Sequence, residues 1–265
     1  MTLAVQQIRR MRGGAQAHLI RCDGGQYYVV KFQNNPQGSR ILANELLATR
    51  LAARLGLPMP QVAIVEVRRE LIEHTDDLVI HVGRGREICK PGMQFGSLYP
   101  GSPAETMVYD FLPDDQLRET ANLADFCGIL AFDKWTCNTN GRQAIFFRAD
   151  GEQRYKAQMI DQGFCFNAAE WNFPDAPLRG LYTRHRVYES VRGMNAFDPW
   201  IARIQTNATP NLFDEISREI PPEWYNDEQD LLWKLMEQLL RRKKLVPELV
   251  LSAWKSSLQP FPNWK

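Results

Sequence analysis

The sequence predicts an α+β protein with two lobes: a small N-terminal lobe of antiparallel strands with one helix, and a larger, mainly helical C-terminal lobe. The first hundred residues hold several runs rich in β-branched and aromatic residues, separated by short turn signals. Pro, Gly and acidic residues cluster between residues 96 and 118, as they do in connectors. Beyond this connector, apolar residues recur mainly at helical spacing. We therefore expect an N-terminal lobe over residues 1–112 and a C-terminal lobe over residues 113–265.

The composition is that of an ordinary globular chain and argues against several classes of protein. With 32 Lys+Arg against 31 Asp+Glu the formal net charge is +1, so the basic excess typical of direct nucleic-acid binding is absent. No apolar run approaches the roughly 20 residues that span a bilayer, and the N-terminal run MTLAVQQIRRMR lacks the apolar core of a signal peptide. The 5 Cys and 4 His residues are far apart, without metal-ligand spacing. We expect a cytoplasmic protein with buried, reduced thiols and no membrane association.

A β-hairpin is expected to open the N-terminal lobe. The runs HLIRC and QYYVVKFQ, over residues 18–33, flank a Gly-containing turn. Apolar residues at helical spacing over 41–52 then predict a helix of about four turns, with Ser39 as N-cap and Gly56 at its end. The runs MPQVAIVEV and DDLVIHVG are typical of further strands.

The C-terminal lobe is expected to begin with a buried helix over residues 119–135, since Leu123, Phe126, Ile129 and Leu130 form an apolar stripe. Two strands, QAIFFR and RYKAQMID, should follow around a turn at residues 149–153. Thr209 with Pro210 predicts the start of another helix, and Asn226 is a candidate cap for a longer one through Leu240. The basic run over residues 241–244 lies at the end of that helix, where cations interact favourably with the helix dipole.

The run FDKWTCN carries the main chemical signal. Asp133 precedes Asn138 by five residues, just after the buried helix. Protein kinases use an Asp and an Asn at this spacing, the Asp to orient and deprotonate the attacking hydroxyl and the Asn to hold magnesium. Asp161 follows at the end of a strand in IDQG, where its carboxylate can chelate the same metal. We expect Asp133 to act as the base and Asn138 and Asp161 to be metal ligands.

The N-terminal lobe supplies the complementary parts in the matching order. Lys31 lies on the second strand of the hairpin and Glu45 on the helix after it, so an ion pair can hold the ammonium over nucleotide phosphates. Gly13 and Gly14 precede the first expected strand, where a loop without side chains brings backbone N–H groups close to phosphate oxygens. The run around Phe95 and Ser97 is the candidate for the adenine-contacting hinge.

These residues give the sequence a family resemblance. The runs YYVVKF, NELLATRLAARLGLPMP, FDKWTCN and MIDQGFCF resemble those of the HipA-like kinases, bacterial relatives of the Ser/Thr protein kinases and phosphoinositide kinases. The resemblance covers roughly residues 10–200. It implies a two-lobed protein-kinase-like fold, ATP with Mg²⁺ in the cleft, and transfer of the γ-phosphate to a Ser or Thr hydroxyl of a protein whose identity the sequence does not reveal.

Three departures from the family pattern leave alternatives open. The catalytic register can run through Asn140 instead of Asp133, and Arg142 and Gln143 can either position substrate or brace the loop. No Ser or Thr lies between Arg12 and His18, whereas the best-known family members inactivate themselves by phosphorylating a Ser in that loop. The chain is also shorter than the family's toxins, so binding of an antitoxin-like partner stays open. A small-molecule or lipid kinase, and a nucleotide-binding pseudokinase that serves as an interaction module, are the alternative functions.

Overall fold

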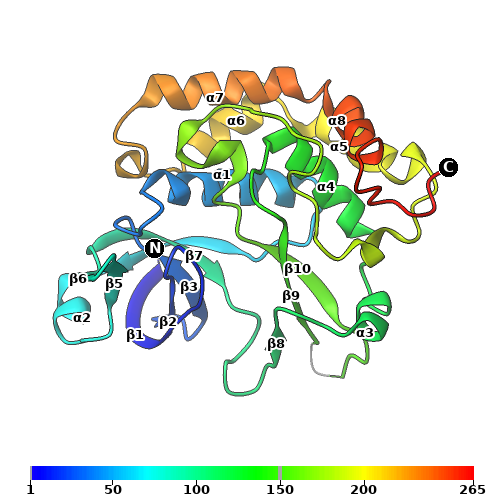
Figure 1. The fold of residues 1–265 in the computed structure, drawn as a ribbon. Helices are drawn as coiled ribbons and strands as arrows, with labels where there is room; N and C mark the ends of the chain where they lie inside the picture. The colour runs from blue at the N-terminus through cyan, green and yellow to red at the C-terminus, as the bar shows by residue number, and fades with distance from the viewer. Residues whose placement is uncertain (1, 149–150) are drawn as a thin grey trace.

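The structure, a computed structural model, describes residues 2–148 and 151–265. A β-rich part built from the N-terminal segment lies below a layer of helices from the C-terminal segment (Figure 1). The turn expected at residues 149–153 includes residues 149 and 150, which lie outside the described residues. The lobe boundary at residue 112 stays a prediction.

Five strands of the N-terminal segment form a closed barrel in the order β1-β2-β3-β7-β4. Its strands are β1 (Thr2–Arg10), β2 (His18–Cys22), β3 (Tyr27–Lys31), β4 (Val62–Val67) and β7 (Gly92–Leu98). β1 pairs with β4 in parallel, and the other pairs are antiparallel. The expected antiparallel sheet is therefore corrected to a barrel with one parallel pair, because closing the sheet joins its two edge strands.

The expectation that the hairpin at 18–33 opens the protein is wrong, because β1 precedes it. β1 escaped prediction because only Ala4 of its residues is buried, so the strand lacks a clear alternation of apolar and polar positions. Gly13 and Gly14 consequently connect β1 to β2 instead of preceding the first strand.

A small subdomain lies beside the barrel. It consists of α2 (Arg69–Glu73) and of β5 (Val79–Val82) and β6 (Gly85–Ile88), which pair only with each other among the described strands. Leu78, Ile80 and Cys89 anchor it in the core of the barrel. The N-terminal segment therefore contains two helices, not one.

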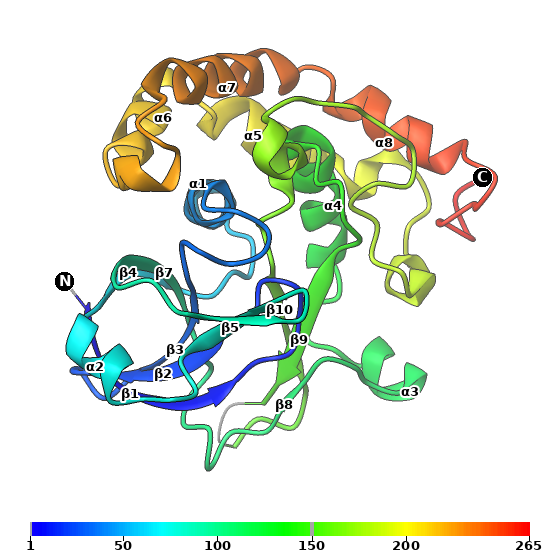
Figure 2. The ribbon, with the colours of Figure 1, turned by 60° about the vertical axis from the view of Figure 1, so that its left-hand side comes forward.

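The helix α1 (Arg40–Arg54) lies between the barrel and the helical layer (Figure 2). Its buried residues, Leu42, Leu46 and Leu51 among them, join the larger hydrophobic core, which also includes the helices of the C-terminal segment. Ser39 precedes the helix as predicted, but its side chain makes no capping hydrogen bond. Because α1 packs against the C-terminal segment and carries Glu45, it places this predicted site residue between the two segments.

A small antiparallel sheet and a layer of helices follow the barrel in the sequence; of these elements, β8 lies before residue 112 and the others lie beyond it. β8 (Val108–Tyr109), β9 (Gln143–Phe147) and β10 (Lys156–Ile160) pair in the order β10-β9-β8. The α-helices are α3 (Asp114–Arg118), α4 (Asp125–Thr136), α5 (Asp198–Asn207), α6 (Pro210–Ser217), α7 (Gln229–Arg242) and α8 (Val246–Trp254). Short 3₁₀ helices lie at Cys165–Glu170, His185–Tyr188, Met194–Ala196 and Pro222–Trp224.

Two helix starts differ from the prediction and one agrees. The helix expected from residue 119 begins at Asp125, because the Asn122 side chain exchanges hydrogen bonds of 2.8 and 2.9 Å with the Ala157 backbone and holds the preceding chain against β10. The long helix α7 begins at Gln229, after Asn226 adopts a left-handed conformation instead of capping it. Thr209 caps α6 as predicted, accepting a 3.3 Å bond from Leu212 N.

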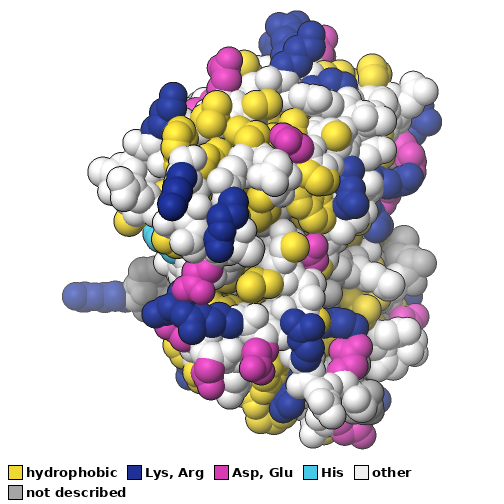
Figure 3. Space-filling model, turned by 90° about the vertical axis from the view of Figure 1, so that its right-hand side faces the viewer, with side chains coloured by type: hydrophobic (Ala, Val, Ile, Leu, Met, Phe, Trp, Pro, Cys, Tyr) yellow, Lys and Arg dark blue, Asp and Glu magenta, His cyan; other side chains and the backbone are white. Residues whose placement is uncertain are grey.

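The surface agrees with the near-neutral charge. On the face drawn in Figure 3, Lys and Arg side chains alternate with Asp and Glu, so this face carries no field of a single sign. Within residues 2–148 and 151–265, no helix combines the length and the apolar character that crossing a bilayer requires. All cysteines are buried and free, as predicted.

Candidate active site

A cavity of about 300 Å³ opens between the barrel, α1 and the three-stranded sheet. The loop Met11–Ala17 lies along one side, and the loop before β9 and the end of β10 lie along the other. Nine residues singled out from the sequence line it: Gly13, Gly14, Lys31, Glu45, Phe95, Ser97, Asn140, Gln143 and Asp161.

Lys31 lies at the centre of the polar end of this cavity. On β3 the side chain of Val30 is buried in the barrel core, so strand alternation turns Lys31 to the opposite face. Its ammonium donates to Glu45 and, at 2.8 Å, to Oδ1 of Asp161. Burial alone would lower the pKa of Lys31, but the two carboxylates raise it above its usual value. Lys31 therefore carries a positive charge inside the cavity.

Glu45 connects three elements through one carboxylate. Besides Lys31, it accepts hydrogen bonds of 3.0 Å from the backbone N–H groups of Gln162 and Gly163. Burial raises the pKa of Glu45, and Lys31 and the Gln162 N–H oppose this effect. A Cβ on Gly163 would lie 2.6 Å from Cγ2 of Ile41, so the glycine allows α1 to approach the segment after β10 this closely. The expected ion pair between Lys31 and Glu45 is thus present and braced by the backbone.

Asp161 directly follows β10 and adopts a left-handed backbone conformation, with φ of 62°. Its Oδ2 accepts a 2.7 Å hydrogen bond from Nε2 of Gln143. Burial would raise the pKa of Asp161, but the charge and hydrogen bond of Lys31 outweigh it and hold the pKa below its usual value. A non-glycine residue in this backbone region is uncommon, and such residues cluster at functional sites.

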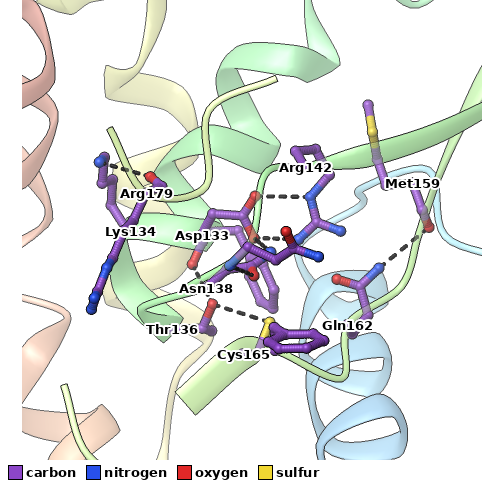
Figure 4. A network of polar contacts seen from close by, with 12 residues as sticks. Asp133, Lys134, Thr136, Asn138, Arg142, Met159, Gln162, Cys165 and Arg179 are labelled. Atoms are coloured by element: carbon purple, nitrogen blue, oxygen red, sulfur yellow. Dashed lines mark hydrogen bonds and ion pairs between the residues drawn. The ribbon is translucent and has the colours of Figure 1, made fainter. Parts of the chain in front are cut away.

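Asp133 is not among the residues that line the cavity, and it belongs to a buried polar network that Figure 4 shows. Its Oδ2 accepts a 2.8 Å bond from Nε of Arg142, and its Oδ1 accepts from Nη2 of Arg142 and, at 3.1 Å, from Nδ2 of Asn138. The side chains of Asp133 and Arg142 are both 0% exposed. Burial raises the pKa of Asp133, against the opposing effect of Arg142. Both carboxylate oxygens are occupied by the protein itself.

The loop after α4 separates the predicted residues into two groups. Cys137 ends the helix in a left-handed conformation, and Oδ1 of the buried Asn138 then accepts a 3.1 Å bond from Asn140 N. The structure therefore brings Asn140 and Gln143 to the cavity with Lys31, Glu45 and Asp161. It leaves Asp133, Asn138 and Arg142 outside the cavity lining.

The position of Gln143 was accessible from the sequence. Ala144 and Phe146 of β9 are buried, so alternation along the strand directs Gln143 and Ile145 to the cavity face. Asn140 offered no such signal, because its orientation depends on the left-handed turn at Cys137.

The apolar end of the cavity lies near the end of β7. Phe95 and Ser97 line it, but Phe95 pairs in the middle of β7 with Lys31 and Ile64 and is buried. The lining continues through Leu98, Tyr99 and Pro100, beyond the end of the strand, where the run Tyr-Pro-Gly was the overlooked sequence signal. Four apolar side chains complete a slot: Val29, Val108, Ile145 and Ile160.

Comparison with known proteins agrees with this geometry. The Golgi casein kinase with Mn/ADP bound superposes with a TM-score of 0.58 at 14% identity, covering 97% of this chain and 74% of that chain. Hydra Fam20 with sugar gives a TM-score of 0.55 at 13% identity, with 97% and 87% covered. The proinflammatory kinase CtkA of Helicobacter pylori gives 0.50 at 12% identity, with 96% and 97% covered.

These similarities show a kinase-like fold. Among curated proteins no significant match was found. The sequence profile of the HipA-like kinases, however, matches residues 4–246, which is most of the sequence, and the chain belongs to the HipA-like kinase family.

Proposed function

We propose that this kinase binds ATP with Mg²⁺ in the cavity and transfers the γ-phosphate to a Ser or Thr hydroxyl of a protein. One observation carries the proposal: the Lys31 ammonium is held between Glu45 and Asp161 at the polar end of a cavity lined by a glycine loop. A fixed cation beside a carboxylate is the arrangement that phosphoryl transfer requires for positioning and charge stabilisation.

The residues of the chain have separate tasks in this proposal. Lys31 contacts phosphate oxygens, and Glu45 keeps the ammonium directed into the cavity. Backbone N–H groups of the loop containing Gly13 and Gly14 approach the phosphates, because neither residue has a side chain in the way. The apolar slot binds the adenine base of ATP, next to the segment from Ser97 to Pro100.

The donor set at the polar end fits magnesium. Asp161 offers a carboxylate, and Gln143 offers an amide oxygen on the same cavity wall. Mg²⁺ prefers such oxygen ligands and is often held by one or two carboxylates together with substrate phosphates. When bound, the ion would neutralise charge on the phosphates. In this proposal Gln143 takes the place expected for Asn138, whose side chain is engaged with Asp133 and Asn140.

The acceptor side of the proposal assigns Asn140, and not Asp133, to the incoming hydroxyl. Asn140 faces the cavity. Its Oδ1 accepts a 2.9 Å hydrogen bond from Gly141 N, and its second lone pair can accept one from a hydroxyl and orient it. Asp133 would not contact the substrate; it would hold Arg142 in place and thereby fix the loop after α4. In a loose phosphoryl-transfer transition state the hydroxyl keeps its proton until late, and positioning and electrostatics supply most of the catalysis. The bond from the γ-phosphorus to the bridging oxygen of ADP breaks as the bond to the hydroxyl oxygen forms, and in this proposal the hydroxyl proton passes to an oxygen of the transferred phosphate.

The same observation favours a second candidate, a nucleotide-binding pseudokinase. Among the described residues that line the cavity, the carboxylates are Glu45 and Asp161, and both are bonded to Lys31. An amide at residue 140 takes no proton from a hydroxyl, so binding without transfer is the consistent alternative.

Radiolabel transfer combined with calorimetry distinguishes the two. Wild-type protein and Lys31→Met are incubated with γ-labelled ATP, Mg²⁺ and a panel of proteins, lipids and small alcohols, and ATP binding is measured in parallel. Label on protein Ser or Thr with the wild type alone supports the proposal, and label on a lipid or small molecule moves the acceptor to that class. ATP binding without transfer supports the pseudokinase. The cytoplasmic location and the antitoxin-like partner stay predictions.

A further inference from the structure

Gln16, in the glycine loop, bonds to a strand outside the barrel. Its Nε2 donates a 2.7 Å hydrogen bond to the carbonyl oxygen of His81, and its Oε1 accepts a 2.8 Å bond from the His81 N–H. Oε1 also accepts a 2.6 Å bond from Nη2 of Arg10, at the end of β1. One side chain therefore satisfies both backbone groups of a residue on β5 while a guanidinium fixes its orientation.

The loop that Gln16 holds forms one wall of the nucleotide cavity. All seven residues of Met11–Ala17 line that cavity. A 2.7 Å bond from Met11 N to Ala17 O closes the loop, and a 3.1 Å bond from Gln16 N to Gly13 O forms a tighter turn inside it. Gln16 itself has φ of 49°, a left-handed conformation that a side chain adopts at a cost. That conformation persists where surrounding contacts enforce it.

The partner of Gln16 is firmly placed. Ile80, the neighbour of His81 on β5, is buried in the core of the barrel, and His18 Nε2 lies 3.3 Å from the carbonyl oxygen of Val79. The subdomain of α2, β5 and β6 thus presents a fixed pair of backbone groups to the loop. On the other side, Nε2 of Gln37 lies 2.8 Å from the position that a Cβ on Gly14 would occupy.

We propose that Gln16 is a positioning residue for nucleotide phosphates: by clamping the glycine loop to β5, it holds the loop N–H groups toward the cavity before ATP arrives. The inference rests on the proposed nucleotide site. A loop that is already ordered in the free protein loses less conformational entropy when ATP binds, so ATP binds more tightly. Without the clamp, a loop with two consecutive glycines samples many conformations, and ATP must order it.

If Gln16 acts as this clamp, its loss should change the affinity for ligands with phosphates but not for ligands without them. Gln16→Ala should weaken binding of Mg·ATP by roughly tenfold, the equivalent of the loss of one or two hydrogen bonds. Adenosine has no phosphate to contact the loop, so its affinity should not change. Amide hydrogen exchange over residues 12–17 should accelerate in the free variant. His81→Ala is the matched control, because His81 contributes only backbone atoms to the clamp and should bind ATP like the wild type.

Calorimetry with Mg·ATP and with adenosine, combined with thermal unfolding, decides the question. Unchanged ATP affinity in Gln16→Ala would overturn the inference, as would equal weakening toward ATP and adenosine, which would point to general damage. If the wild type binds adenosine but gains nothing from phosphates, the inference fails while the adenine slot survives. If the wild type binds neither ligand, the proposed function itself fails.

Discussion

The ammonium nitrogen of Lys31 lies 2.8 Å from Oδ1 of Asp161, although 130 positions separate the two residues in the sequence. Lys31 belongs to the barrel, whereas Asp161 follows the sheet of the C-terminal segment. With Glu45 on α1 as the third member, one cation joins three separate elements at the cavity. A variant at any of the three should therefore disturb nucleotide binding.

The first prediction concerns the metal. If Asp161 is a magnesium ligand, Asp161→Asn should weaken ATP binding about tenfold or more in Mg²⁺ and change it little in EDTA, because the lost interaction is with the ion. Calorimetric titration under both conditions measures this. Asp115→Asn, at an exposed position on α3, is the control and should behave as the wild type. Equal weakening with and without Mg²⁺ would instead indicate loss of the contact to Lys31.

The second prediction separates Asp133 from Asn140. Asp133→Ala leaves the buried Arg142 guanidinium without its counter-ion, so it should lower the free energy of unfolding by about 3–5 kcal/mol. Asn140→Ala removes a cavity-facing amide and should change stability by less than about 0.5 kcal/mol while reducing turnover. Urea unfolding and single-turnover phosphate transfer provide the two measurements.

A conservative variant tests the competing role of Asp133 as base. In Asp133→Asn an amide oxygen still accepts one bond from Arg142, so some stability returns. If Asp133→Asn is fully stable but its turnover falls about 10²-fold or more, and Asn140→Ala stays active, Asp133 would be the catalytic base and Asn140 would not take part in the reaction.

The sequence was most informative where local pattern and chemistry coincide. Strand alternation around Lys31, helical spacing around Glu45 and a strand ending at Asp161 each give an orientation without tertiary information. The Asp133–Asn138 spacing matched a known pattern as well, but spacing alone does not reveal which side of the loop faces the cavity. That side is set by the left-handed turn at Cys137 and by the side-chain bonds of Arg142 to Asp133, neither of which residue spacing reveals.

The barrel shows a second limit. β1 exposes most of its residues, and its pairing with β4 closes the sheet through a contact between residues 2–3 and 65–66. Such a long-range pairing leaves no periodic signal in a single sequence. The glycine loop was found but placed before the first strand for this reason, and its bond to β5 through Gln16 was not predicted.

The third prediction concerns self-inactivation. No Ser or Thr lies from Arg12 to His18, so a phosphate cannot add its charge of about −2 to the loop by modification of a hydroxyl. Protein incubated with ATP and Mg²⁺ should therefore keep its nucleotide affinity, and mass spectrometry should find no phosphate in residues 9–25. A phosphorylated residue in that range, accompanied by loss of ATP binding, would contradict this prediction.

The fourth prediction concerns pH and a residue outside the cavity. His18 on β2 is fully buried, and its ring lies edge-on to Phe32 with the centroids 5.7 Å apart. Burial lowers the pKa of His18 below its usual value, and Arg10 acts in the same direction, while the carbonyl of Val79 and the charge of Asp77 oppose the shift. The imidazole is therefore neutral in the folded protein at neutral pH.

The sign of the pH effect follows from this lowered pKa. The unfolded chain protonates His18 with a pKa of about 6.5, so below that pH the unfolded state binds more protons than the folded state. Stability should therefore fall as the pH drops below about 6.5 and should not depend on His18 above it. In urea unfolding at a series of pH values, wild type should lose more stability between pH 7.5 and 5 than His18→Gln does. His74→Gln, at an exposed position, serves as control and should follow the wild type. Burial also lowers the pKa of His185, but both proteins contain His185, so its contribution to the pH dependence cancels in the comparison. Parallel pH profiles for wild type and His18→Gln would show that His18 does not govern the acid sensitivity of the barrel.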